Sequence, residues 1–221
     1  MGPQVKVCGM KDPARVQEAV ALGAAYIGLV FYPPSPRALD PARAAELAAL
    51  VEPPARTVGL FVDADERAIE AVLRYVPLDI LQLHGDETPE RVRDLGLWSS
   101  LPVMKAIRVE ERADLALLDE HANAADMLLF DAKPPRRADA LPGGNGLPFD
   151  WRLLEGLSLP KPWVLAGGLN PDNLATAVGL LHPPIVDVSS GIESRPGVKD
   201  KDKLAAFLRE AARLAAQDQD A

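Results

Sequence analysis

The 221-residue chain predicts an α/β fold, a single (β/α)₈ TIM barrel with parallel strands, on three observations. Short apolar runs rich in β-branched residues alternate with alanine- and leucine-rich stretches along the whole sequence. Eight such runs recur at intervals of 22 to 36 residues, enough for a strand, a helix and two loops. Their continuous apolarity is typical of parallel strands covered by helices. We therefore expect one barrel domain over residues 1–221, smaller than the usual ~250 residues.

The predicted strands are all short and follow one another in a regular order. They cover residues 4–8, 26–30, 57–62, 79–83, 102–107, 126–131, 162–166 and 184–189. A doubly wound open sheet is the competing architecture. It would place a glycine-rich turn after the first strand, and the string CGMKD at 8–12 lacks that fingerprint.

Helix boundaries are signalled in the gaps between these strands. Asp12-Pro13, Asp40-Pro41 and Asn170-Pro171 each place a capping residue before a proline, which is favoured at the first helical position. Gly23 stands where the first helix is expected to end. These signals predict helices after the first, second and seventh strands.

Composition excludes several functional classes. The formal charge of −8 and the absence of a basic cluster argue against a nucleic-acid partner. No segment approaches the roughly 18 apolar residues of a membrane span, and the N-terminus does not resemble a signal peptide. A lone cysteine excludes an internal disulfide. We expect a cytoplasmic protein, a monomer or a homodimer, that binds a small molecule and neither nucleic acid nor membrane.

Polar and small residues gather at the predicted C-terminal ends of the strands, where barrels carry their functional groups. They are Cys8, His84, Asp131, Gly167, Gly168, Ser189 and Ser190. Cys8 ends the first strand, and the following Gly9 is expected to leave room beside the sulfur. A buried cysteine often serves only as a small hydrophobe, so its position alone leaves both interpretations open.

Three glycine-containing segments predict a phosphate site. They are PGGNG at 142–146, AGGL at 166–169 and SSGIE at 189–193. Glycine lets backbone N–H groups approach an anion, and the loops after the last two strands are the usual phosphate site of such barrels. The predicted phosphate-binding residues are Gly143, Gly144, Gly146, Gly167, Gly168, Ser190 and Gly191. The alternative is that these glycines only form tight turns and caps.

Charged residues near the rim each allow two interpretations. Asp131 is either a general acid or a residue that caps a loop or pairs with Lys133. Alternation places Lys6 on the face of Cys8 and Asp187 on the face of Ser189. Because the first and last strands are neighbours in a closed barrel, Lys6 can pair with Asp187 inside it. Asp187 can instead contact substrate hydroxyls.

Arg37 and the histidines complete the candidate residues. Arg37 lies in the proline-stiffened string PPSPR and suits carboxylate recognition, with a solvated arginine as the alternative. His84 is either a catalytic base or a residue hydrogen-bonded within the rim. His121 and His182 lack ligand spacing, so no metal site is predicted.

An ordered set of strings covers nearly the whole chain and resembles the phosphoribosylanthranilate isomerase family of tryptophan biosynthesis. The set is VKVCG, GLVFYPPSPR, GLFVD, LQLHGDE, LLFDAK, GGNG with FDW, AGGLNPDN and DVSSGIESRPGVKD. The resemblance implies a cofactor-free Amadori rearrangement of N-(5-phosphoribosyl)anthranilate. It also implies that Cys8 is the general base and Asp131 the general acid. Arg37 would then hold the anthranilate carboxylate, and Asp187 would lie near the sugar.

The implied chemistry suits these residue types. Ring opening needs a proton on the furanose oxygen, and a thiolate can then remove the proton on carbon 2 of the iminium. Because an unperturbed thiol has a pKa of ~8.5, Cys8 is expected in a polar or electropositive pocket, where Lys6 or the iminium assists. One departure from the family pattern is Asn145, at a position where a residue with a hydroxyl group is common. The contact of that hydroxyl with the phosphate is then missing.

Two other functions remain open from the sequence. A different phosphosugar isomerase or epimerase could use the same barrel and phosphate site, although such relatives in histidine biosynthesis carry an aspartate where this chain has Cys8. A phosphometabolite-binding protein without activity would lack the acid or the base, and both are present here.

Overall fold

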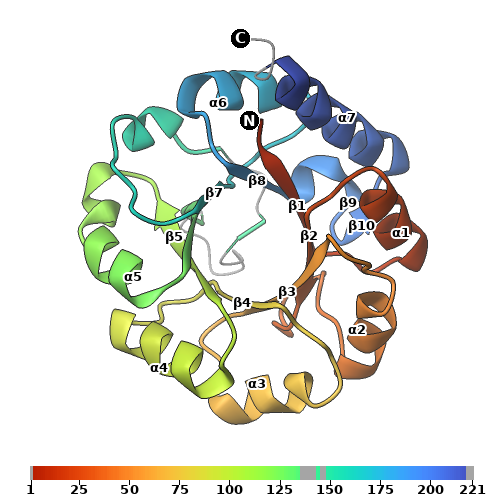
Figure 1. Cartoon of the computed structure of the whole chain (residues 1–221), viewed down its shortest axis with the longest axis vertical. Coiled ribbons are helices and arrows are strands. Elements are labelled where there is room, and N and C mark those ends of the chain that lie inside the picture. The colour runs from red at the N-terminus through yellow and green to blue at the C-terminus, as the bar shows by residue number, and fades with distance from the viewer. Residues whose placement is uncertain (1, 135–142, 145–147, 218–221) are drawn as a thin grey trace.

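The computed structural model describes residues 2–134, 143–144 and 148–217. Eight parallel strands form a closed barrel in the order β1 to β8, with β8 pairing back onto β1, and helices form an outer ring (Figure 1). The strands are β1 (Gln4–Cys8), β2 (Tyr26–Val30), β3 (Arg56–Phe61), β4 (Ile80–Leu83), β5 (Val103–Val109), β6 (Met127–Ala132), β7 (Trp163–Leu165) and β8 (Ile185–Val188). Every predicted strand is confirmed to within a few residues at each end.

The helices cover the outer face of the barrel. They are α1 (Pro13–Ala21), α2 (Pro41–Ala48), α3 (Glu66–Leu73), α4 (Pro89–Ser99), α5 (Leu118–Ala124), α6 (Leu174–Leu181) and α7 (Lys201–Gln217). In the described residues, short 3₁₀ helices accompany them, namely η1 (Arg112–Leu115), η2 (Trp151–Leu154) and η3 (Ser190–Ile192). Asp12 and Asp40 cap α1 and α2 as predicted, and the chain leaves α1 through Gly23 with φ +88°.

Two connections differ from the (β/α)₈ pattern that the sequence predicts. Asn170-Pro171 does not begin α6, because the Asn170 side chain accepts bonds from the backbone N–H groups of Asp172 and Asn173 and forms a separate turn. In the described part of the connection from β6 to β7, the helical segment is the 3₁₀ helix η2 and not an α-helix. Asp150 caps η2 and Gly156 follows it with φ +73°, which leaves too few residues between them for a full α-helix.

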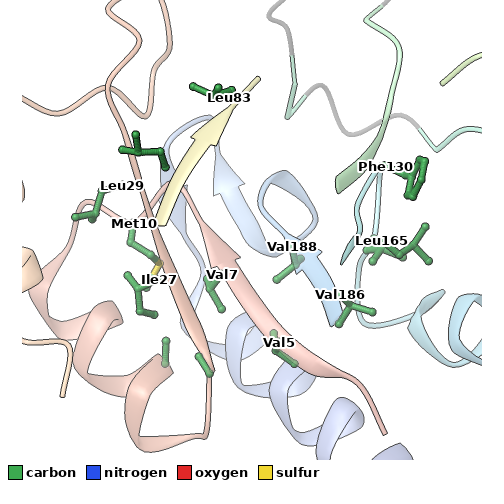
Figure 2. Close-up of a cluster of buried hydrophobic side chains, with 14 of the residues drawn as sticks. Val5, Val7, Met10, Ile27, Leu29, Leu83, Phe130, Leu165, Val186 and Val188 are labelled. Atoms are coloured by element: carbon green, nitrogen blue, oxygen red, sulfur yellow. The ribbon is translucent and has the colours of Figure 1, made fainter. Parts of the chain in front are cut away.

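Side-chain alternation along the strands separates two buried layers. Val5 and Val7 of β1 belong to the large apolar cluster between the strands and the helices, part of which Figure 2 shows around β1, β2 and β8. A second cluster fills the interior and includes Val58, Met104 and Leu129. Such an interior is a packed core and not a pore. Ligands therefore bind at the rim of the barrel.

A small hairpin follows η3 and adds to this rim. Its strands β9 (Glu193–Arg195) and β10 (Val198–Lys199) pair antiparallel outside the barrel sheet. Gly197 makes the turn with φ +80°, and a Cβ there would lie 2.5 Å from the carbonyl oxygen of Pro36. The hairpin therefore packs closely against the proline-rich loop that carries Arg37.

Candidate active site

A cavity opens at the C-terminal ends of the strands. It brings together side chains from almost every part of the sequence, as the barrel prediction requires. The predicted site residues that line it are Cys8, Arg37, Asp131, Gly143, Gly144, Gly167, Gly168, Asp187 and Ser190. The remaining lining residues include Tyr32, Ser35, Gln82, His84 and Ser189.

Cys8 is buried at the end of β1, beside Gly28 of β2. A Cβ at Gly28 would lie 3.0 Å from the Cys8 Sγ atom, so this glycine leaves the space that the sulfur occupies. That Gly9 also leaves room beside the sulfur stays a prediction. Gly9 has φ +77° and packs on the alkyl chain of Arg37, whose Cδ would lie 2.5 Å from a Cβ there.

A buried ion pair lies directly below the cysteine. The Lys6 Nζ atom donates to Asp187 Oδ1 at 2.9 Å across the β1–β8 pairing, which confirms the predicted pair. Burial lowers the pKa of Lys6, but Asp187 and Cys8 outweigh it, so that the pKa lies above its ordinary value. Lys6 is therefore a fixed positive charge next to the thiol.

The electrostatics of Cys8 differ in part from the expectation. Burial raises the pKa of the Cys8 thiol, whereas the positive charges of Lys6, Lys199 and Arg37 act to lower it. Burial prevails, and the pKa lies above its ordinary value. The surroundings are electropositive as expected, yet they do not make Cys8 a thiolate in the ligand-free protein.

Asp131 is buried at the end of β6, and its contacts exclude one of the alternatives predicted for it. Its Oδ1 atom accepts a hydrogen bond from the Ala132 N–H at 2.8 Å, and its Oδ2 atom lies 3.2 Å from His84 Nε2. The predicted alternative of a pair with Lys133 was wrong, because Lys133 bonds to Asp114 at 2.6 Å. Asp131 thus presents its carboxyl group to the cavity beside an imidazole.

His84 hydrogen-bonds within the rim, which was one of its two predicted roles. Its Nδ1 atom lies 2.9 Å from the Gln82 amide nitrogen, and its Nε2 atom faces Asp131. Gln82 lies in β4 and His84 directly follows the last residue of that strand, two positions on, so their side chains share a face. This contact therefore orients the imidazole toward the acid from below.

Arg37 is buried and is not a solvated side chain. Its Nε and Nη2 atoms donate to the two carboxylate oxygens of Glu193, each at 2.8 Å, and Nη2 also donates to the Gly144 carbonyl oxygen at 3.2 Å. A Cβ at Gly144 would lie 2.6 Å from Arg37 Nη1. One edge of the guanidinium, Nε and Nη2, is thus held by Glu193, and the remainder of the group lines the cavity.

The predicted phosphate loops lie in different surroundings. Gly167 and Gly168 follow β7 with φ +80° and +69°, and they line the cavity with Ser190. Gly191 packs behind them, where a Cβ would lie 1.9 Å from the Leu169 carbonyl oxygen. This contact fixes the loops after β7 and β8 against each other.

Gly143 lies elsewhere along the cavity wall. A Cβ at Gly143 would lie 2.6 Å from His84 Nε2 and 2.7 Å from Asp131 Oδ2, so this residue covers the acid. Gly146 and Asn145 are outside the described residues, as is most of the 132–148 loop. Phosphate binding by Gly143, Gly144 and Gly146 stays a prediction.

Three residues of the site were missed from the sequence. Gln82 could have been found, because alternation along LQLH places it on the face of His84. Glu193 and Lys199 belong to a string that was recognised, but nothing local marks them as partners of Arg37. Their roles depend on contacts between distant parts of the chain.

Two further findings concern metals and membranes. Within residues 2–134, 143–144 and 148–217, no group of three or more His, Cys, Asp or Glu side chains is arranged to hold a metal ion. No helix in this described part combines the length and apolarity that crossing a membrane requires.

Fold and site together define a (β/α)₈-barrel enzyme with a thiol and a carboxyl group at the rim of one cavity. A sequence profile described as N-(5'phosphoribosyl)anthranilate (PRA) isomerase matches residues 5–210. The chain belongs to this N-(5'-phosphoribosyl)anthranilate isomerase family.

Individual relatives agree with this assignment. The isomerase of Paracoccus denitrificans is 54% identical over 96% of this chain and 98% of its own length, and that of Rhodospirillum centenum is 53% identical over 97% and 100%. Among solved structures, the Thermotoga maritima isomerase superimposes with a TM-score of 0.83 at 34% identity, covering 96% of this chain and all of its own. The Thermus thermophilus isomerase gives 0.83 at 32% identity, with 96% and 99% coverage.

Proposed function

We propose that this chain isomerises N-(5-phosphoribosyl)anthranilate to 1-(2-carboxyphenylamino)-1-deoxyribulose 5-phosphate in tryptophan biosynthesis, with Cys8 as general base and Asp131 as general acid. The observation that carries the proposal is that one cavity of a family member contains both side chains together with Arg37 and the Gly167-Gly168 turn. A solved isomerase at 33% identity and TM-score 0.80 is described in complex with the reduced form of this product.

Substrate binding uses three parts of the cavity. The N–H groups of Gly167, Gly168 and Ser190 bind the phosphate, because glycine turns allow the backbone to approach an anion closely. Arg37 binds the anthranilate carboxylate through the part of its guanidinium that Glu193 leaves available. Asp187 lies near the sugar while it remains paired with Lys6. Both ends of the substrate are then fixed around the reacting carbons.

The reaction begins with proton transfer from Asp131 to the furanose oxygen. The bond between this oxygen and carbon 1 breaks, and the nitrogen lone pair forms the iminium. Cys8, as the thiolate, then removes the proton on carbon 2, and the electrons of that C–H bond neutralise the iminium to give an enolamine. Transfer of the enol proton to carbon 1 yields the ketone.

The buried thiol becomes a base only when substrate is present. In the ligand-free protein the pKa of Cys8 lies above its ordinary value because of burial. The positive iminium adds to the charge of Lys6 and favours the thiolate, in the same way that neighbouring cations do. The thiol proton passes through solvent to the Asp131 carboxylate, which has given its own proton to the furanose oxygen. Deprotonation of Cys8 is thereby coupled to formation of the intermediate that needs it.

Turnover by purified variants tests these roles. The substrate is formed from anthranilate and phosphoribosyl pyrophosphate by the preceding transferase, and its fluorescence decay is followed. Cys8→Ala and Asp131→Asn are each expected to reduce kcat by at least about 100-fold, whereas the exposed Asp119→Asn on α5 keeps wild-type kcat. Near-normal kcat in both Cys8→Ala and Asp131→Asn contradicts the roles, and absence of turnover by the wild type contradicts the function. Complementation of a tryptophan auxotroph, with Cys8→Ala as the negative control, tests the function in cells.

The chain is further proposed to work as one barrel domain, in the cytoplasm, as a monomer or a homodimer. Support for this comes from the free thiol of Cys8, which suits a reducing compartment. A relative from Thermotoga maritima at 34% identity is described as a dimeric isomerase. Light scattering coupled to size exclusion distinguishes the two oligomeric states, and a larger assembly contradicts both.

A further inference from the structure

The β9–β10 hairpin places two buried charged side chains directly behind Arg37. Glu193 and Lys199 are each 8% exposed, although most of the hairpin between them faces solvent. Neither residue lines the cavity, whereas Arg37 and Ser189, which they contact, both do. Buried charges are costly unless they are paired and hydrogen-bonded, so this arrangement needs a physical reason.

Glu193 uses both carboxylate oxygens to hold its neighbours. Its Oε1 atom accepts from Arg37 Nε at 2.8 Å and from Lys199 Nζ at 2.9 Å. Its Oε2 atom accepts from Arg37 Nη2 at 2.8 Å and from the Gly197 N–H at 3.2 Å. Two parallel bonds fix the plane of the guanidinium as well as its position. A long arginine side chain that would otherwise sample many rotamers is therefore held in one.

Lys199 does not line the cavity and completes the cluster. Besides Glu193, its Nζ atom donates to the backbone carbonyl and the hydroxyl of Ser189, at 3.0 and 3.3 Å. All three of its N–H groups therefore have acceptors on the protein. Ser189 in turn donates its hydroxyl to the Cys8 carbonyl oxygen at 3.1 Å. The hairpin is thus linked to both the arginine and the base.

Glu193 is the ionised carboxylate of this cluster. Burial raises the pKa of Glu193, but Arg37 and Lys199 outweigh it, and the net shift is downward, so Glu193 is ionised at neutral pH. Burial lowers the pKa of Lys199, although Glu193 acts to raise it. Lys199 is directed at protein acceptors. The guanidinium of Arg37, which lines the cavity, is therefore the cationic group that a carboxylate on the ligand meets.

We propose that Glu193 is a positioning residue that sets the specificity of this site for a substrate with an aromatic carboxylate, by holding Arg37 in the orientation that receives it. The inference rests on the proposed function, in which Arg37 binds that carboxylate. Loss of Glu193 leaves the guanidinium present but free to turn and charge-unbalanced. The site then recognises the carboxylate poorly while the acid, the base and the phosphate loops stay intact.

Two ligands that differ only in the carboxylate test this role. They are reduced 1-(o-carboxyphenylamino)-1-deoxyribulose 5-phosphate and the same compound without its carboxyl group, with Kd measured by calorimetry. The wild type is expected to prefer the first by about 10- to 100-fold. In Glu193→Gln this preference falls about tenfold, KM rises by a similar factor, and kcat stays within about threefold, because the contact is made in ground and transition state alike.

Two variants complete the design. Arg195→Gln removes an exposed charge from the same hairpin and keeps the wild-type preference. Glu193→Asp keeps the charge for Arg37 and Lys199 but is too short to make every contact, so its preference lies between those of the wild type and Glu193→Gln. Glu193→Asp also carries the test if Glu193→Gln does not fold.

The outcomes separate the inference from the proposed function. If the role of Glu193 is purely structural, its loss weakens the binding of both ligands equally. An unchanged preference between the two ligands in the folded variants therefore overturns the inference. If the wild type itself neither turns over substrate nor distinguishes the two ligands, the proposed function fails and not this inference alone.

Discussion

Replacing Lys6 by methionine separates what the buried ion pair does for stability from what it does for Cys8. Lys6 is fully buried and its Nζ atom lies 2.9 Å from Asp187 Oδ1. At that distance and an effective dielectric constant of ~20, the gross attraction is about 6 kcal/mol. Desolvation offsets much of it, but removing one partner leaves a buried unpaired carboxylate. We therefore expect Lys6→Met to lose about 3–5 kcal/mol of unfolding free energy, measured in urea.

The same variant also tests the electrostatics of the base. Because Lys6 acts to lower the pKa of Cys8, its loss raises that pKa further. Below the pKa, each unit of increase lowers the thiolate fraction tenfold. Cys8 is the only cysteine, so the pH dependence of alkylation by iodoacetamide reports on it directly.

A double variant checks both effects. Lys6→Met/Asp187→Leu removes both charges and is expected to recover at least about 2 kcal/mol of the lost stability. Because the charge of Asp187 raises the pKa of Cys8, its loss offsets part of the effect of losing Lys6, and the alkylation profile shifts less than in Lys6→Met alone. Lys6→Met with unfolding free energy within about 1 kcal/mol of the wild type, or with an unshifted alkylation profile, refutes the reasoning.

Three other predictions concern the same part of the barrel. Gly28→Ala introduces a Cβ 3.0 Å from Cys8 Sγ. We expect this crowding to cost about 1–3 kcal/mol of unfolding free energy in thermal unfolding and to lower kcat. An unchanged Tm and an unchanged kcat contradict this prediction. Because burial raises the pKa of Cys8, the unfolded chain loses this proton first as pH rises, and stability falls above about pH 9 by up to ~1.4 kcal/mol per pH unit. Cys8→Ala lacks that contribution. If the unfolding free energy falls with pH equally steeply in the wild type and in Cys8→Ala between pH 9 and 10, this prediction is wrong. Arg37→Lys loses the two-pronged contact and is expected to raise KM at least about tenfold; an unchanged KM argues against carboxylate binding.

Local patterns determined most of the architecture. The apolar runs predicted all eight strands, and alternation along β1 and β8 correctly placed Lys6, Cys8 and Asp187 inside the barrel. Aspartate followed by proline correctly marked the starts of α1 and α2. These features succeed because they depend on the geometry of a few consecutive residues, which the sequence contains in full.

Only the tertiary structure decided which side chains meet at the rim. Asp131 lies against His84 and not against nearby Lys133, and Arg37 bonds to Glu193, which is 156 residues away along the chain. Gly28 on the neighbouring strand, 20 residues along the chain, leaves space for the Cys8 sulfur. Such partners are set by barrel closure and by loop packing, which bring distant residues to one place. Opposite charge alone does not determine which of the many charged residues of this chain form ion pairs. Each pair depends on which groups the fold has buried together.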